Sequence, residues 1–173
     1  VRETLAITAY ATADFALALR ELRTYRRITG RDDQLPMMVD CERGLGRPDK
    51  ALELARAVPK GTLPVPVQVE LAIAMSGARL DLGQTEAALR ELEIPQLDPS
   101  KAFSWSPDLF GAYAVVLDEL GRTEESAQWL RRSEVAAEAL GLDDDGDDDF
   151  DVVDLEDEDP DVERDEVAVE RAE

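Results

Sequence analysis

The feature that most constrains the fold is a six-residue motif that recurs along the chain. It begins with a glycine that follows a leucine, continues with four mostly polar residues and ends at a small residue. The motif occupies residues 46–51, 83–88 and 121–126, and a weaker copy occupies 13–18. Its closing small residues, Ala18, Ala51, Ala88 and Ser126, are spaced by 33, 37 and 38. Repetition on this scale is typical of folds built from stacked supersecondary units.

Each copy of the motif predicts the turn of a helical hairpin. Glycine tolerates the left-handed backbone that ends a helix, and Pro48 suits the first turn of the next one. Ser106 and Pro107 likewise predict a capped helix start. No strand-like alternation is sustained, so we expect no sheet. The expected helices span 1–12, 15–29, 34–45, 48–57, 67–82, 85–93, 107–120 and 123–140.

Two sets of apolar positions are expected to pack between these helices. The small residues that close the motif allow helices to approach closely. Four positions further on, larger residues are expected to fill the space between hairpins. These larger residues are Leu22, Ala55, Leu92 and Leu130.

The pattern resembles the tetratricopeptide family, whose helix–turn–helix repeat has about 34 residues. First-helix positions of that repeat match Leu5-Ala6, Met38-Val39, Met75-Ser76 and Tyr113-Ala114, together with Leu35, Ala72 and Phe110. The chain departs from the pattern in two of its spacings and at Arg79, where an aromatic residue is usual. The resemblance covers about residues 1–140. It implies an all-α, helix-turn-helix repeat solenoid of about four antiparallel pairs, assigned here to a domain of residues 1–142.

The resemblance also implies a function, that of a non-catalytic adaptor or scaffold that binds another protein or peptide. Family peptide-binding positions lie on the first helices, which line the concave face of such a solenoid. One family variant clamps a C-terminal carboxylate with lysine and asparagine, but this chain has no asparagine. The expected groove leans acidic toward the fourth repeat, which suits a basic peptide, and each of its matching residues also fits a solvated surface. Matching positions give Asp40, Arg43, Glu70, Gly77, Asp108, Gly111 and Asp118, with Arg79 nearby.

A second expected surface is a stripe of arginines on the second helix. Their spacings of three and four residues place Arg20, Arg23, Arg27 and Arg31 on one side of it. The stripe fits a solvated face, a contact with nucleic acid or a contact with the chain's own acidic tail. The alternative function is therefore a nucleic-acid- or ribosome-associated regulator whose tail competes with polyanions.

The charge of −21 is concentrated in residues 143–173. That segment has 18 acidic residues against Arg164 and Arg171, a net of −16. Such a composition cannot bury enough apolar area to fold, so we expect a disordered acidic tail. Phe150, Val152, Val153 and Leu155 alternate with acids there. This alternation fits either a solubilising tail or a short segment that orders on a partner.

The residue inventory argues against catalysis. The chain has no histidine and a single cysteine, Cys41, which removes histidine-dependent triads and cysteine-based zinc clusters. It has no phosphate-binding loop with its lysine. We therefore expect no enzyme, no cofactor and no metal site, with Cys41 a small buried hydrophobe rather than a reactive thiol. No apolar run approaches the length of about 20 residues that spans a bilayer, and no leader opens the sequence, so we expect a cytoplasmic protein without membrane contact.

Overall fold

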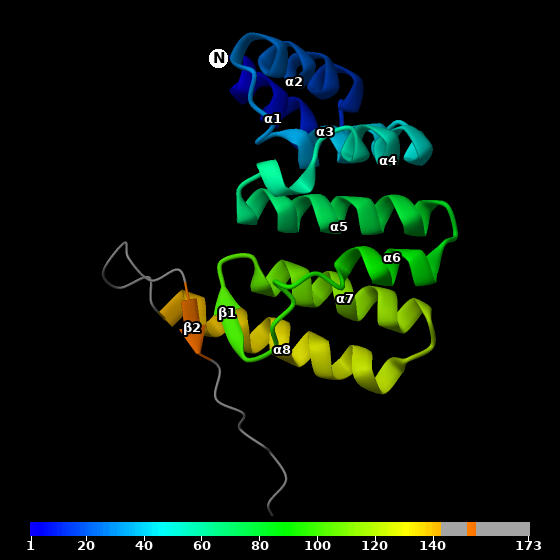
Figure 1. Cartoon of the computed structure of the whole chain (residues 1–173), viewed down its shortest axis with the longest axis vertical. Helices are drawn as coiled ribbons and strands as arrows, with labels where there is room; N and C mark the ends of the chain where they lie inside the picture. Colours follow the sequence, from blue (N-terminus) through cyan, green and yellow to red (C-terminus); the bar gives the residue numbers. More distant parts are fainter. Residues whose placement is uncertain (143–151, 155–173) are drawn as a thin grey trace, which may run out of the picture.

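The computed structural model describes residues 1–142 and 152–154, and within them eight α-helices follow one another (Figure 1). The predicted helices are confirmed to within two residues at each end. The fifth begins two residues early because it accommodates Pro66 in its first turn. A 3-10 helix, η1 (Lys60–Thr62), precedes it. The helices are α1 (Arg2–Ala11), α2 (Phe15–Thr29), α3 (Leu35–Gly44), α4 (Pro48–Arg56), α5 (Val65–Asp81), α6 (Thr85–Leu92), α7 (Ser106–Glu119) and α8 (Thr123–Leu142).

The turn inside each helix pair has the same backbone geometry all four times. In the third pair, Gly83 has φ 69°, its N–H donates to Leu80 O at 2.8 Å, and the next N–H, that of Gln84, donates to Arg79 O at 2.9 Å. Such paired bonds commonly close a helix that ends at a left-handed residue. Equivalent bonds follow Ala13, Gly46 and Gly121, whose φ angles are 59°, 72° and 76°. The motif alignment, including its weak first copy, is thus confirmed at the turns.

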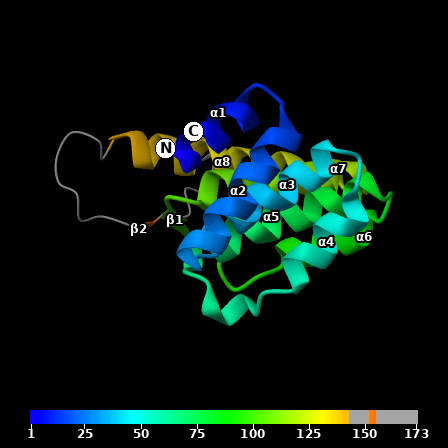
Figure 2. The same cartoon turned by 90° about the horizontal axis from the view of Figure 1, so that it is seen from above.

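Successive helix pairs stack along the long axis of the molecule (Figure 1), and the view along that axis shows them overlying one another (Figure 2). Each pair packs internally, and α3, α5 and α7 also pack in sequence on one another. The apolar clusters cross from pair to pair: one cluster joins Val39 of α3 and Ala55 of α4 to Leu71 of α5. A pair therefore buries its apolar side against its neighbour, which is how successive units pack in stacked-repeat proteins.

The small residues of the motif are buried as expected. Ala18, Ala51 and Ala88 are fully buried, and the half-buried Ser126 donates from Oγ to Ala114 O at 2.8 Å. Of the four gap-filling positions, three are fully buried, but Leu130 is 51% exposed, so that expectation was wrong. No further helix pair packs on α8 within the described residues.

The last helix buries a different face from the one on which Leu130 lies. Ala136 of that face is fully buried, and Trp129 meets Phe110 and Tyr113 of α7 edge to face at centroid distances of 5.2 and 4.9 Å. These contacts fix α8 against α7.

A short strand pair interrupts the helical architecture. Strand β1 (Lys101–Phe103) pairs antiparallel with β2 (Val152–Asp154) beside α8, with Ala102 opposite Val153. The expectation of no sheet was therefore wrong for these residues, since three-residue strands are too short to show alternation. The predicted disorder of 143–151 and 155–173 lies outside the described residues, and 152–154 form a strand instead.

The hydroxyl of Ser106 hydrogen-bonds with the backbone of β1 and does not cap α7. The fully buried Ser106 is the first residue of α7, and the helix has no side-chain cap. Its Oγ accepts the Phe103 N–H at 2.8 Å and lies 3.4 Å from Lys101 O. The predicted capping role was wrong because the strand preceding α7 uses this hydroxyl.

Candidate binding surfaces

A groove of about 620 Å³ lies along the first helices of the four pairs. Its apolar surface includes Met37 of α3, Ile73 of α5 and Ala112 of α7. A volume of this size is typical of ligand sites that hold a few residues of a peptide. The complete lining is Tyr10, Pro36, Met37, Asp40, Glu70, Ile73, Pro107, Asp108, Gly111, Ala112 and Ser133.

The only charged side chains in this lining are acidic: Asp40, Glu70 and Asp108. Glu70 and Asp108 form no ion pair with the described residues. Desolvation by the groove wall, and then the negative charge of Asp108, raise the pKa of Glu70. The two carboxylates are thus close enough to repel each other, and a cation placed between them would relieve that repulsion.

Asp40 is held in place by neighbouring side chains. Its carboxylate accepts from Arg43 Nη1 at 2.8 Å, and Tyr10 Oη of α1 donates to it at 3.5 Å. The Arg43 side chain continues across Gly77, contacting the space that a side chain there would fill, and Arg43 Nε donates to Asp81 of α5 at 2.8 Å. Arg43 therefore fastens α3 to α5 beside the groove and does not line it.

Two other predicted residues also lie outside the groove. Arg79 turns toward α6, where its Nε lies 3.3 Å from Glu91 and its Nη1 donates to Gln84 at 2.6 Å. Asp118 is exposed on α7 and is absent from the groove lining. The structure thus brings Asp40, Glu70 and Asp108 together, along with Gly111, and places Arg43, Arg79 and Asp118 elsewhere.

Several groove residues were not predicted from the sequence. Tyr10 lies three residues before the left-handed residue of its turn. The predicted residues Arg43 and Asp118 lie at the same distance before the left-handed residues of their own turns. The alignment could therefore have found Tyr10. Met37, Ile73 and Ser133 had no comparable signal, since apolar and small residues at helical spacing are mostly core.

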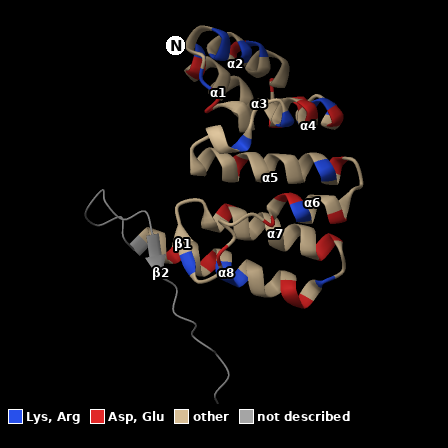
Figure 3. Cartoon of the chain, in the orientation of Figure 1, with Lys and Arg blue, Asp and Glu red and all other residues tan. Residues whose placement is uncertain are grey.

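A second hollow, the arginine pocket, has a volume of about 440 Å³ and lies at the N-terminal end of the stack, where basic residues gather on α2 (Figure 3). Arg20, Arg23 and Arg27 of the predicted stripe line it, together with Arg47 from the turn between α3 and α4. Arg31 does not line it and pairs with Asp33 at 3.2 Å. The rest of the lining is Ala16, Leu19, Thr24 and Leu45.

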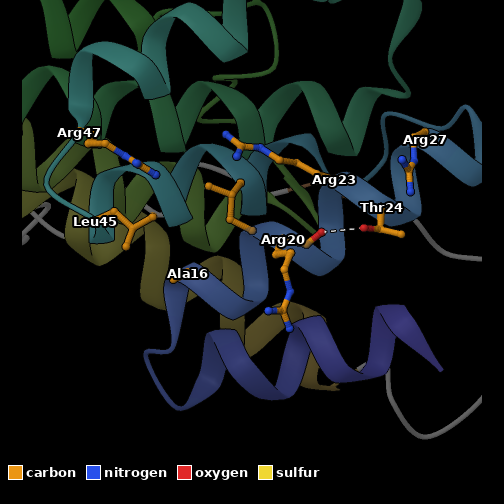
Figure 4. A pocket seen from close by; sticks show the side chains of 8 residues that line it. Ala16, Arg20, Arg23, Thr24, Arg27, Leu45 and Arg47 are labelled. Carbon is orange, nitrogen blue, oxygen red and sulfur yellow. Dashed lines mark hydrogen bonds between the residues drawn. The ribbon is translucent and has the colours of Figure 1, made fainter.

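A buried carboxylate orders part of the arginine pocket. Glu42, with 3% of its side chain exposed, lies 2.7 Å from Arg23 Nη2 and 2.7 Å from Arg47 Nε. The Arg47 Nε contact is an ion pair without a well-directed hydrogen bond. Accordingly, Arg23 and Arg47 extend toward one another, whereas Arg20 points toward α1 (Figure 4).

The remaining arginines of the pocket are less constrained. Arg20 has 71% of its side chain exposed and shares Glu21 with Arg2 of α1. Arg27 is exposed and forms no ion pair within residues 1–142 and 152–154. The pocket therefore has a net positive charge around an apolar floor.

Metal binding and thiol chemistry have little structural basis in the described residues. Among them, no group of three or more His, Cys, Asp and Glu side chains is placed to hold a metal ion. Cys41 is fully buried, and desolvation, followed by the charges of Asp40 and Glu42, raises the pKa of its thiol to about 11. No helix in the described part is both long enough and apolar enough to cross a membrane. Comparison with known proteins finds no matching family model and no similar curated protein.

Proposed function

We propose that this chain is a non-catalytic adaptor of the tetratricopeptide type that binds a basic peptide in the groove. The observation on which this rests is the acidic couple Glu70 and Asp108, which form no ion pair within the described residues and lie in a groove lined by side chains from all four helix pairs. The four equivalent turns and the buried small residues support the family assignment.

The groove chemistry favours a peptide with cationic and apolar side chains. A lysine or arginine near Glu70 and Asp108 would meet two carboxylates that no cation of the described residues pairs with. Aliphatic side chains of the same peptide would cover Met37, Ile73 and Ala112. Arg43 supports this arrangement indirectly, because it orients Asp40 and joins α3 to α5.

The test is a binding titration with a short fluorescein-labelled peptide in which lysine and arginine alternate with leucine and alanine. The full chain is compared with the double variant Glu70→Gln/Asp108→Asn. Losing two solvent-accessible charge pairs of about 0.7 kcal/mol each weakens affinity by about tenfold. The same peptide with glutamate in place of its cations is expected not to bind.

The matched control is Asp49→Asn/Glu53→Gln, which removes the same charge from exposed positions of α4, away from the groove. It is expected to bind like the unaltered chain. Equal weakening by both double variants would mean that only overall charge attracts the peptide, and the proposal would then be wrong.

A further inference from the structure

The arginine pocket calls for a ligand different from that of the groove. It combines four arginines with an apolar floor of Ala16, Leu19 and Leu45. Leu45 is 36% exposed, so part of its side chain is open to solvent at the pocket. The complementary ligand therefore has carboxylates that alternate with aliphatic side chains.

Nucleic acid fits this pocket less well than an acidic peptide does. Non-sequence-specific binding of single strands relies on aromatic side chains that stack on bases, and no aromatic residue lines the pocket. The chain's overall charge of −21 would also repel a polyanion approaching from solution. An acidic segment already tethered to the chain avoids the translational entropy cost of association from solution.

We infer that the arginine pocket binds the chain's own acidic segment, residues 155–173, within the same molecule. That segment has ten acidic residues against two arginines. It includes the stretch 165–170, in which Asp165, Glu166 and Glu170 flank Val167 and Val169. The acids match the arginines of the rim and the valines match the apolar floor.

The segment is long enough to reach the pocket. The segment starts after β2, which contacts α8. From α8, the packed helices α7, α5 and α3 lead in that order to α2, where the pocket lies. Four steps of 8–10 Å between helix axes give a separation of about 40 Å. About twelve extended residues cover that distance, which brings the pocket within reach from about residue 165 onward.

The experiment uses the full chain with a nitroxide attached at Ala172→Cys. Cys41 is buried with a raised thiol pKa, so a maleimide at neutral pH reacts at residue 172. We expect loss of backbone amide signal in residues 16–27 and 45–47 at low salt. The loss should disappear in 1 M NaCl, where the screening length falls to about 3 Å.

The variant that tests the pocket is Arg20→Gln/Arg27→Gln, because these arginines are exposed and neither holds the buried Glu42. It should restore the amide signals near the pocket. The matched control, Arg56→Gln/Arg131→Gln, removes two exposed arginines outside the pocket and should leave the signal loss intact.

Three results would overturn the inference. The first is that the chain with intact arginines shows no signal loss, or that the loss is unchanged in Arg20→Gln/Arg27→Gln. The second is signal loss in an isotope-labelled chain mixed with an unlabelled, nitroxide-bearing chain, which would assign the docking to a second copy. The third is an RNA oligonucleotide that binds the pocket at micromolar concentration while the segment causes no signal loss, which would make nucleic acid the ligand.

Discussion

Ala13 adopts the left-handed backbone conformation, φ 59°, at the place in the first helix pair that Gly83 occupies, with φ 69°, in the third. A left-handed residue other than glycine costs roughly 1–2 kcal/mol. Ala13 tolerates this because it closes α1 with the same pair of hydrogen bonds that Gly83 and Gln84 form at the end of α5. The first turn is therefore strained relative to the other three.

Relief of this strain is the first prediction. Ala13→Gly should raise the free energy of unfolding by about 1 kcal/mol, and Gly83→Ala should lower it by a similar amount. A side chain at Gly83 meets no atom within 4 Å, so its cost comes from the backbone alone. Urea denaturation of both variants is the measurement. Gly61→Ala, at a position without a positive φ and with open space around it, is the control and should raise the free energy of unfolding by about 0.4–1 kcal/mol. A destabilised Ala13→Gly would contradict the prediction.

The second prediction concerns the buried carboxylate of Glu42. Arg23→Ala combined with Arg47→Ala removes both cations that pair with Glu42. The carboxylate of Glu42, with 3% of its side chain exposed, is then left without a counter-charge. Breaking a buried ion pair costs about 3–5 kcal/mol, and the half-exposed arginines reduce this to about 2 kcal/mol here. Adding Glu42→Gln should recover most of the loss, because the uncompensated charge disappears. A double-mutant cycle by urea denaturation measures this coupling, and strictly additive effects would exclude it.

The third prediction is that Cys41 is unreactive in the folded chain. Only the thiolate reacts, and the pKa of this thiol is raised to about 11 in a fully buried site. A disulfide reagent at pH 8 should label it slowly in buffer and rapidly in strong urea. Because the raised pKa keeps the thiol neutral, its contribution to stability is lost only as pH rises toward 11. Rapid stoichiometric labelling without urea would favour the reactive-thiol alternative.

Local chemistry explains why most of the helices and turns could be predicted. Glycine punctuation and helical periodicity set the turns directly, and alignment alone identified the one at Ala13. The same alignment places Glu70 and Asp108 thirteen residues before their turns, so stacking of equivalent helices brings them together. Both signals are contained in the spacing of the repeats along the sequence.

The errors arose where burial depends on distant packing. Leu130 matches its equivalents in sequence, yet nothing in the described residues covers its face of α8. Arg47 joins Arg23 only because the turn between α3 and α4 packs beside α2 and shares Glu42. Arg79 was expected near the groove but is drawn toward Glu91 of α6. No spacing rule within a single helix reports such neighbours.

The fourth prediction is a pH-dependent stability contribution from Glu70. Desolvation and the charge of Asp108 raise the pKa of Glu70, so its ionised form is disfavoured in the folded chain. A carboxyl with a raised folded pKa stabilises the fold below its unfolded pKa and loses that contribution as pH rises through the folded pKa. Glu70→Gln should therefore be more stable than the unaltered chain at pH 7, by on the order of a few tenths of a kcal/mol because solvent screens the carboxylate. The difference should vanish near pH 4.

Asp108→Asn separates the two causes of this shift. It removes the neighbouring charge but leaves the desolvation of Glu70, the larger cause, in place. The stability gained by a further Glu70→Gln substitution should then be smaller than in the unaltered chain, though not zero. Urea denaturation at pH 4 and pH 7 measures each step. A destabilising effect of Glu70→Gln at pH 7 would mean that Glu70 is paired with a cation from outside the groove lining. The groove could then no longer be considered open to a basic peptide.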